Sequence, residues 1–430
     1  MNKTKVLHTD ILILGGGLSG LSTAFHLEKS GHTNYLLVEK NNFFGGLSAS
    51  TEKQGFTFDY SGHLLHLRDP YTLKWIRSLL KANLSKLKRK AFIDFDGKRV
   101  PFPFQANLWA LPESVRQECL QGALQAEQST SKKPKNFEEW CLRAFGTGIY
   151  RHFMRPYNRK LWQTDPKKMM WDWCGPFVPE PDIAQIKRGA AAKPRQAFGY
   201  NTYFYYPKRG GCAALANALA AKIPNTWLQA NVEKIDFKKK EARINGQTVY
   251  FKRLVNTLPL KDLIKISTAP ADLKAEARKL KHTTVEVLNF AVNRTVEPFH
   301  WLYFPQENVP FYRVGMQSSF SPDNAPEGCS SFYVETAEKI TDRPKAEKAI
   351  FQALIQKGII DRRDKILLSF WQTLPVAYSI YDKNRAPAVN KILRWLSKNH
   401  CFCAGRYGLW EYSFMERSLL QGRDIVKKLL

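Results

Sequence analysis

The first apolar stretch of the chain is short and continuous. Residues 11–14 are four apolar side chains in a row after Asp10, a pattern typical of a buried β-strand. The run leads directly into a glycine-rich turn, and residues 21–29 then predict a helix. A second apolar run at residues 35–38 predicts another strand. Strand, turn, helix and strand in this order predict an α/β fold for this part of the chain.

Further along, the pattern predicts a second group of helices and strands. Apolar positions from Trp75 to Leu87 fall three to five residues apart, which predicts one helix with a lysine-rich exposed face. Residues 227–259 alternate like a strand meander, with Asn245 and Gly246 as a hairpin turn. The remaining predictions are helices at residues 213–221 and 419–430 and strands at 285–292 and 332–336.

Length and composition set limits on the class of protein. A chain of 430 residues with 44% hydrophobic and 13% aromatic residues predicts two or more packed cores and excludes a disordered or fibrous protein. Lys and Arg number 66 against 38 Asp and Glu, a net charge of +28. The lysine clusters carry no aromatic stacking platform, so we expect no nucleic-acid partner. An anionic substrate or peripheral contact with an anionic membrane would account for the charge.

Targeting and metal-binding signals are weak. The N-terminal residues do not resemble a signal peptide, and no apolar run approaches the roughly 18 residues of a membrane span, so we expect a soluble, cytoplasmic protein. Seven scattered cysteines predict reduced thiols. Cys401 and Cys403 lack a second ligand pair at suitable spacing, and we therefore expect no metal site. The oligomeric state is not determined by the sequence.

A glycine motif directly after the first predicted strand carries the first strong chemical signal. Gly15, Gly17 and Gly20 have the spacing G-x-G-x-x-G. These glycines allow a tight turn, a close approach of backbone to pyrophosphate, and close packing of the next helix. Glu39, at the end of the second predicted strand, is placed to accept hydrogen bonds from ribose hydroxyls. The combination predicts a dinucleotide-binding site.

The residues after Glu39 separate a flavin from a nicotinamide cofactor. Gly45 and Gly46 allow a loop to pass close to a phosphate or to the ribityl chain, and Ser61-Gly62-His63 follows soon after. These segments resemble the FAD-binding region of the amine oxidase and protoporphyrinogen oxidase superfamily. Within it they are most similar to the UDP-galactopyranose mutase family, in which the histidine at the position of His63 lies against the flavin.

The resemblance extends along most of the chain, through residues 101–105, 156–162, 205–211 and 401–412. It implies a Rossmann-like FAD-binding domain of the glutathione-reductase type with a β-meander, joined to a mixed α+β substrate domain. The predicted division is 1–70, 205–265 and 385–430 for FAD, and 71–204 and 266–384 for substrate. The predicted cofactor contacts are Gly15, Gly17, Leu18, Ser19, Gly20, Glu39, Lys40, Gly45, Gly46, Leu47, Ser48, His63, Val232, Gly405, Arg406, Tyr412 and Met415.

The resemblance leaves the reaction open between two kinds of flavin chemistry. In a mutase, reduced FAD is the nucleophile and arginines hold the diphosphate of a sugar nucleotide. This chain has Phe177 where the mutase pattern places one such arginine. Our leading hypothesis is therefore an FAD-dependent oxidoreductase that transfers a hydride to flavin N5, with the mutase as the alternative. A second alternative is a membrane-docked flavin-binding protein without turnover.

The predicted site in the substrate domain comes from the resemblance to the mutase family, whereas an oxidoreductase would need mainly a shaped apolar pocket, which the aromatic residues around Trp301 and Tyr312 suit. The segments around Arg313 and Tyr378 resemble the sugar-pocket segments of the mutase family. The resemblance implies His63, Arg313 and Tyr381 as catalytic residues. It implies a small-molecule substrate bound by Tyr312, Arg313, Tyr378, Tyr381 and Asp382.

Overall fold

The computed structural model describes residues 7–128, 133–175, 177–195, 198–199 and 202–430. Its first sheet runs in the order β10-β11-β12-β1-β2-β9, with β18 beside β12. β1 is parallel to both β2 and β12, and β10, β11 and β12 form an antiparallel meander. The strands are β1 (Leu7–Leu14), β2 (Tyr35–Val38), β9 (Thr226–Trp227), β10 (Val232–Asp236), β11 (Glu241–Ile244), β12 (Gln247–Asn256) and β18 (Cys401–Cys403).

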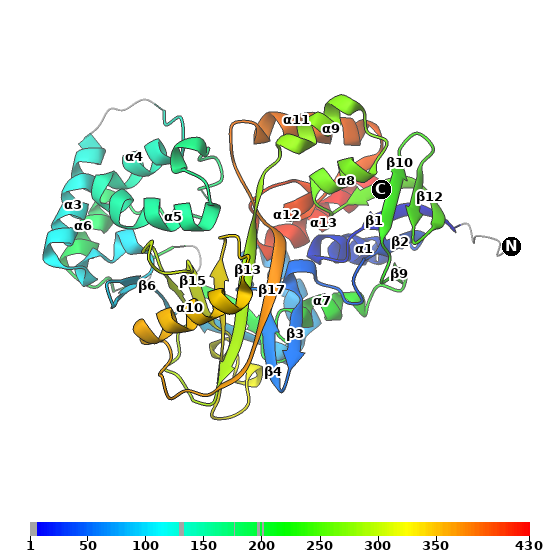
Figure 1. Cartoon of the computed structure of the whole chain (residues 1–430). Helices are drawn as coiled ribbons and strands as arrows, with labels where there is room; N and C mark the ends of the chain where they lie inside the picture. The colour runs from blue at the N-terminus through cyan, green and yellow to red at the C-terminus, as the bar shows by residue number, and fades with distance from the viewer. Residues whose placement is uncertain (1–6, 129–132, 176, 196–197, 200–201) are drawn as a thin grey trace.

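Helices cover both faces of this sheet, which explains why β1 is apolar without alternation (Figure 1). Ile11 and Ile13 pack with the helices of one face, whereas Leu12 and Leu14 pack with those of the other. The first face carries α1 (Leu18–Lys29), α2 (Pro70–Leu80), α7 (Ala213–Ala220) and α13 (Met415–Leu429). The second carries α8 (Leu260–Ile266), α9 (Ala271–Lys279) and α11 (Arg385–Lys398).

A second sheet is mostly antiparallel and runs in the order β17-β13-β16-β15-β14-β6-β7. Its strands are β6 (Ala91–Phe95), β7 (Lys98–Pro101), β13 (His282–Val292), β14 (Trp301–Tyr303), β15 (Arg313–Met316), β16 (Ser330–Thr336) and β17 (Ile366–Ser379). Helix α10 (Arg343–Gln356) packs on one face. A layer of four helices packs against Trp301, Tyr312 and Tyr333, which lie on or beside the strands of this sheet. The helices are α3 (Glu113–Gln128), α4 (Phe137–Ile149), α5 (Arg155–Trp162) and α6 (Ile183–Ala191).

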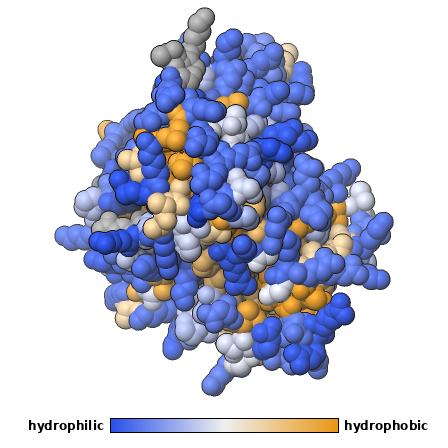
Figure 2. Space-filling view, turned by 90° about the vertical axis from the view of Figure 1, so that its left-hand side faces the viewer, coloured by the Kyte–Doolittle hydropathy of each residue, from blue (hydrophilic) through white to orange (hydrophobic). Residues whose placement is uncertain are grey.

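Smaller elements connect the two halves. Two antiparallel ribbons pair β3 (Ser50–Lys53) with β4 (Phe56–Asp59) and β5 (Leu84–Lys88) with β8 (Tyr203–Pro207). The one-turn helix α12 (Gly405–Gly408) follows β18. On the side of the helical layer the surface is mostly hydrophilic, with hydrophobic groups gathered in local areas at the upper left and lower right (Figure 2). No helix in the described part of the chain is both long and apolar enough to span a membrane.

The predicted fold class is confirmed, and most predicted elements are present with slightly extended ends. The single helix predicted through Leu87 is wrong. Helix α2 ends at Leu80, where Lys81 follows with a φ of 49°, and residues 84–88 form strand β5. Leu84 and Leu87 match a helical stripe by spacing, yet their backbone pairs with β8. The division into two domains stays a prediction. The first sheet does combine strands from all three segments predicted for the FAD domain, since β18 comes from the third of them.

Candidate active site

A cavity of about 540 Å³ lies where β1, β2 and β12 end at the same edge of the first sheet. Parallel sheets of this type bind ligands at the carboxyl ends of their strands. The structure places all the predicted cofactor residues on its wall except Gly20 and Tyr412. The lining that the sequence did not indicate includes Phe43, Tyr60, Asn231, Thr257, Asp262 and Ser418.

The three motif glycines have different roles in this cavity. A Cβ atom on Gly15 would lie 2.5 Å from Thr257 Oγ1, and one on Gly20 would lie 2.0 Å from the Gly15 oxygen. These two glycines therefore permit close packing within the protein. A Cβ on Gly17 would meet only the Gly45 oxygen, at 3.9 Å, and would project into open space. Gly17 thus leaves room beside the N-terminus of α1, where a phosphate would be stabilised.

Glu39 lines the same cavity and is almost fully buried. Its Oε2 accepts from the Gly16 backbone N–H at 2.8 Å, and its Oε1 accepts from the backbone N–H and Nδ2 of Asn41 at 2.9 and 2.8 Å. An ionised carboxylate has about four acceptor positions. Three are used, so one is left for a ribose hydroxyl, and the residues present fit an FAD molecule.

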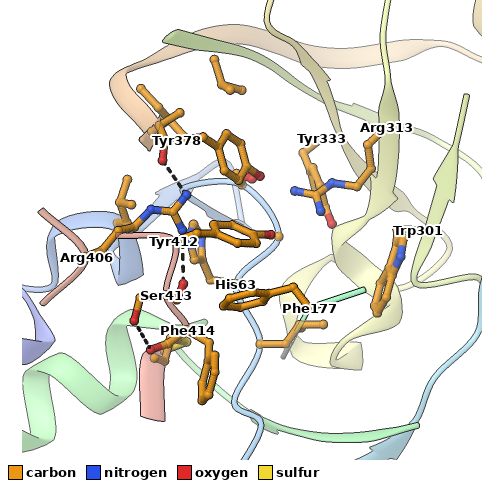
Figure 3. A pocket seen from close by; sticks show the side chains of 18 of the residues that line it. His63, Phe177, Trp301, Arg313, Tyr333, Tyr378, Arg406, Tyr412, Ser413 and Phe414 are labelled. Carbon is orange, nitrogen blue, oxygen red and sulfur yellow. Dashed lines mark hydrogen bonds between the residues drawn. The ribbon is translucent and has the colours of Figure 1, made fainter. Parts of the chain in front are cut away.

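A second, smaller cavity of about 140 Å³ adjoins the first and lies between the two sheets. The two cavities share the lining residues Leu47, His63, Leu374, Arg406, Ser413, Phe414 and Met415. Arg406 and Arg313 approach this space from opposite sides, and aromatic side chains lie between them (Figure 3). We refer to it as the substrate cavity.

The charge of Arg313 is balanced by a buried carboxylate. Arg313 Nε donates to Glu335 Oε2 at 2.5 Å, and Nη2 donates to Oε1 at 2.7 Å. Ser61 Oγ also donates to Oε1. Burial acts to raise the pKa of Glu335, but the guanidinium overcomes this and holds that pKa below its usual value. The pair is therefore ionised and contributes no net charge to the cavity.

Two glycines make room for another side chain of this wall, Tyr333. A Cβ on Gly315 would lie 1.9 Å from Tyr333 Cζ, and one on Gly62 would lie 2.2 Å from Tyr333 Oη. The Tyr333 ring therefore occupies the space that these two positions leave free. The sequence prediction missed Tyr333 and Glu335, which are two residues apart on β16 and so share a face.

Arg406 is held by backbone carbonyls and aromatic rings. Its Nη2 donates to the Ala377 oxygen at 2.5 Å and its Nη1 donates to the Ser413 oxygen at 3.3 Å. The guanidinium carbon lies 4.7 Å from the ring centre of Tyr378 and 5.2 Å from that of Tyr412. These contacts orient the arginine at the junction of the two cavities.

Phe177 closes one side of the substrate cavity with an aromatic contact. Its ring centre lies 4.1 Å from that of Tyr412 and 5.8 Å from that of Phe414. The sequence prediction placed Phe177 in the position of a mutase arginine, and here its side chain is part of an apolar wall. Trp301, Tyr303, Leu374 and Ala377 continue that wall.

Of the residues predicted to contact substrate, Tyr312, Arg313 and Tyr378 line the cavity, but Tyr381 and Asp382 do not. The Tyr381 hydroxyl accepts from the Tyr412 backbone N–H at 2.9 Å. Asp382 accepts from the backbone N–H of Asn384 and Arg385 and lies 3.3 Å from Lys281 Nζ. The chain leaves the cavity after Ser379, so these two side chains organise the start of α11 and support Tyr412. Neither side chain lines either cavity, and their contacts with substrate, like the catalytic role of Tyr381, stay a prediction.

His63 lines both cavities, and its buried Nδ1 has no partner in the described structure. Burial, assisted by the charge of Arg406, lowers the pKa of His63 to about 4. The imidazole is therefore neutral at physiological pH. An orphaned polar atom at the junction of the cavities fits a contact with a bound cofactor or substrate.

The low pKa of His63 predicts a pH-dependent stability. Below pH 6.5 the unfolded chain takes up a proton that the folded protein excludes, so stability falls as the pH drops from 6.5 toward about 4. In the His63→Gln variant this decrease in the free energy of unfolding should be smaller by up to about 3 kcal/mol. Urea unfolding across this pH range, with exposed His8→Gln as the control, measures the effect. An unchanged slope in His63→Gln would contradict it.

The fold and the two joined cavities define a flavoprotein with a substrate site beside the cofactor. The chain belongs to the family of flavin containing amine oxidoreductases, whose model matches residues 18–430. It is therefore a flavoenzyme, and the predicted cofactor, FAD, is confirmed together with the predicted superfamily.

The similar proteins include a protoporphyrinogen oxidase and UDP-galactopyranose mutases. A crystal structure of reduced UDP-galactopyranose mutase superposes with a TM-score of 0.93 and 28% identity, covering 98% of this chain and 93% of that one. Protoporphyrinogen oxidase 1, chloroplastic, of Arabidopsis thaliana is 26% identical over 172 residues, which are 37% of this chain and 32% of that protein. "Probable UDP-galactopyranose mutase" of Klebsiella pneumoniae is 24% identical over 168 residues, 37% of this chain and 42% of that protein. The matches thus span less than half of these two curated relatives.

Proposed function

We propose that this protein is an FAD-dependent oxidoreductase that oxidises a small, mainly apolar substrate in the substrate cavity. The observation that carries the proposal is the pairing of Arg313 with Glu335, which leaves Arg406 as the one uncompensated charge among the described residues of the cavity wall. Bound FAD would supply the hydride acceptor, at N5 of the flavin.

The size and wall of the cavity favour a substrate of about one ring. A volume of about 140 Å³ is close to that of a cavity that holds benzene. The side chains of Phe177, Trp301, Tyr303 and Tyr412 offer aromatic surface on which a flat molecule packs. His63 is neutral and would orient a polar group of the substrate or cofactor through one hydrogen bond.

Oxidation of a small aromatic amine tests the proposal. The name of the family suggests the amine class, and phenylethylamine is an amine with a single aromatic ring. We expect the FAD-loaded protein in air to release hydrogen peroxide and the corresponding aldehyde. Trp301→Ala should raise KM at least tenfold by removing one wall, whereas Trp227→Ala, remote from the substrate cavity, should leave KM unchanged. If phenylethylamine yields no hydrogen peroxide and no aldehyde, the choice of an aromatic amine is wrong.

A sugar-nucleotide mutase is the second candidate, and the superposition with UDP-galactopyranose mutase over nearly the whole chain favours it. Arginine side chains free to form bidentate hydrogen bonds would stabilise the charge of a diphosphate leaving group. In this cavity Phe177 is apolar, Arg313 is paired and Arg406 is bound to carbonyls. The geometry therefore supports the mutase less well than the oxidoreductase.

Chromatography of UDP-galactofuranose incubated with the oxidised or the dithionite-reduced protein separates the two candidates. We expect no conversion with either form. Conversion to UDP-galactopyranose by the reduced form alone would show that the mutase hypothesis is right and the oxidoreductase proposal wrong.

A cytoplasmic location stays part of the proposal.

A further inference from the structure

Two segments of this chain contain basic residues and no acidic residue. Residues 70–93 have seven Lys and Arg and no Asp or Glu, and residues 183–232 also have seven and none. Together they carry half of the net charge of +28. The active site does not account for this excess, because few of these residues line either cavity.

The structure brings the two segments together through the ribbon of β5 and β8. Lys86 is directly opposite Tyr205, and Lys88 is opposite Tyr203. Lys86 and Lys88 are exposed, and Tyr203 is 50% exposed, one of the few large hydrophobic side chains with this exposure. We call this outward row, Lys86, Lys88, Tyr203 and Tyr205, the basic ribbon.

The inner side of the ribbon is fixed to the protein core. Phe204 and Tyr206 are buried, and the Phe204 ring packs against His300 and Phe320. Tyr205 also exchanges two backbone hydrogen bonds with Leu65, at 2.8 and 3.1 Å. The outward row is therefore held on a rigid backbone, and in the described structure its two lysines form no ion pair that would neutralise them.

Helix α2 adds further charge beside the ribbon. Arg77 Nη2 donates to the Tyr205 hydroxyl at 3.5 Å, and its guanidinium lies 5.8 Å from the Tyr205 ring centre. Lys74 on the same helix and Lys81 at its C-terminal end are also exposed. The cations of α2 are thus joined to the ribbon through the contact of Arg77 with Tyr205.

We propose that the basic ribbon docks the protein on a membrane surface that contains anionic phospholipid. Lysines near such a surface are attracted to the headgroups, and tyrosine side chains favour the membrane interface. The alternative, single-stranded nucleic acid, needs free ring faces for stacking. Lys86 Nζ already covers Tyr203 at 4.9 Å and Arg77 covers Tyr205, so stacking would have to displace both cations.

Vesicle sedimentation of the full-length, FAD-loaded protein tests this surface. We expect binding to vesicles of phosphatidylcholine and phosphatidylglycerol, no binding to phosphatidylcholine alone, and release in about 1 M NaCl, where charges are screened beyond about 3 Å. Lys86→Gln/Lys88→Gln should weaken the partition coefficient about 30-fold, because each lysine contributes about 1 kcal/mol.

Lys238→Gln/Arg362→Gln is the matched control, since it removes the same charge from exposed positions on other elements. We expect this control to bind as the unmodified protein does. Equal loss in both double variants would show a nonspecific effect of net charge and would overturn the proposal. Binding to neutral vesicles, or no binding to the anionic vesicles, would also overturn it. Tight binding of a labelled single-stranded oligonucleotide in place of anionic vesicles would identify nucleic acid as the partner instead.

Discussion

Gly17→Val should yield a folded but colourless protein. The Cβ at this position meets only the Gly45 oxygen at 3.9 Å, so the backbone can accept a side chain without a clash in the cofactor-free protein. The valine methyl groups would then occupy the space beside the N-terminus of α1 that a pyrophosphate requires. We expect FAD affinity to fall at least 100-fold and activity to be lost. The absorption spectrum of the purified variant measures the loss.

The matched control for this variant is Gly175→Val. Gly175 has no atom within 4 Å of its added Cβ and lies outside the cofactor cavity. The control should stay yellow. Circular dichroism of Gly17→Val should match that of the unmodified protein. A yellow Gly17→Val protein would contradict the placement of the phosphates, and an unfolded one would show a structural role instead.

Arg313→Met should destabilise the protein strongly. It would leave Glu335 buried without the guanidinium, with hydroxyl groups such as that of Ser61 in its place. Removal of one partner from a buried ion pair typically costs about 3–5 kcal/mol. Guanidinium unfolding of the FAD-loaded protein measures this loss, and substrate oxidation should also fall because the side chain lines the cavity.

The double variant Arg313→Met/Glu335→Gln separates lost pairing from lost packing. Without the orphaned carboxylate, most of the lost stability should return. Arg363→Met, which removes an exposed pair with Asp361, should change stability little. If the double variant is as unstable as Arg313→Met, the buried charge is not the cause.

The cofactor site could be predicted from the sequence because its determinants are local. The glycines, the helix N-terminus and Glu39 lie within 25 residues of one another, and parallel strands bring their ends to one sheet edge. Gly405 and Arg406, far along the chain, required the family resemblance. The structure places Gly405 against Ser19, whose Oγ would lie 2.3 Å from a Cβ added to Gly405.

The substrate cavity was less predictable because tertiary pairing determines it. Arg313 faces Glu335 across the register of β15 and β16, and no local pattern indicates that a carboxylate would neutralise it. Tyr381 and Asp382 lie outside the lining of the cavity, because the chain after β17 turns into the start of α11, where Asp382 accepts from the Arg385 backbone N–H. Leu84 and Leu87 matched a helix by spacing, but strand pairing decided their conformation.

Anaerobic mixing of phenylethylamine with the oxidised, FAD-loaded protein tests the central claim most directly. The claim is that the substrate cavity presents an apolar molecule to the flavin for oxidation. It predicts that the oxidised-flavin absorption band bleaches on mixing and returns when oxygen is admitted. An unchanged spectrum with this amine, together with conversion of UDP-galactofuranose by the reduced protein, would contradict the claim.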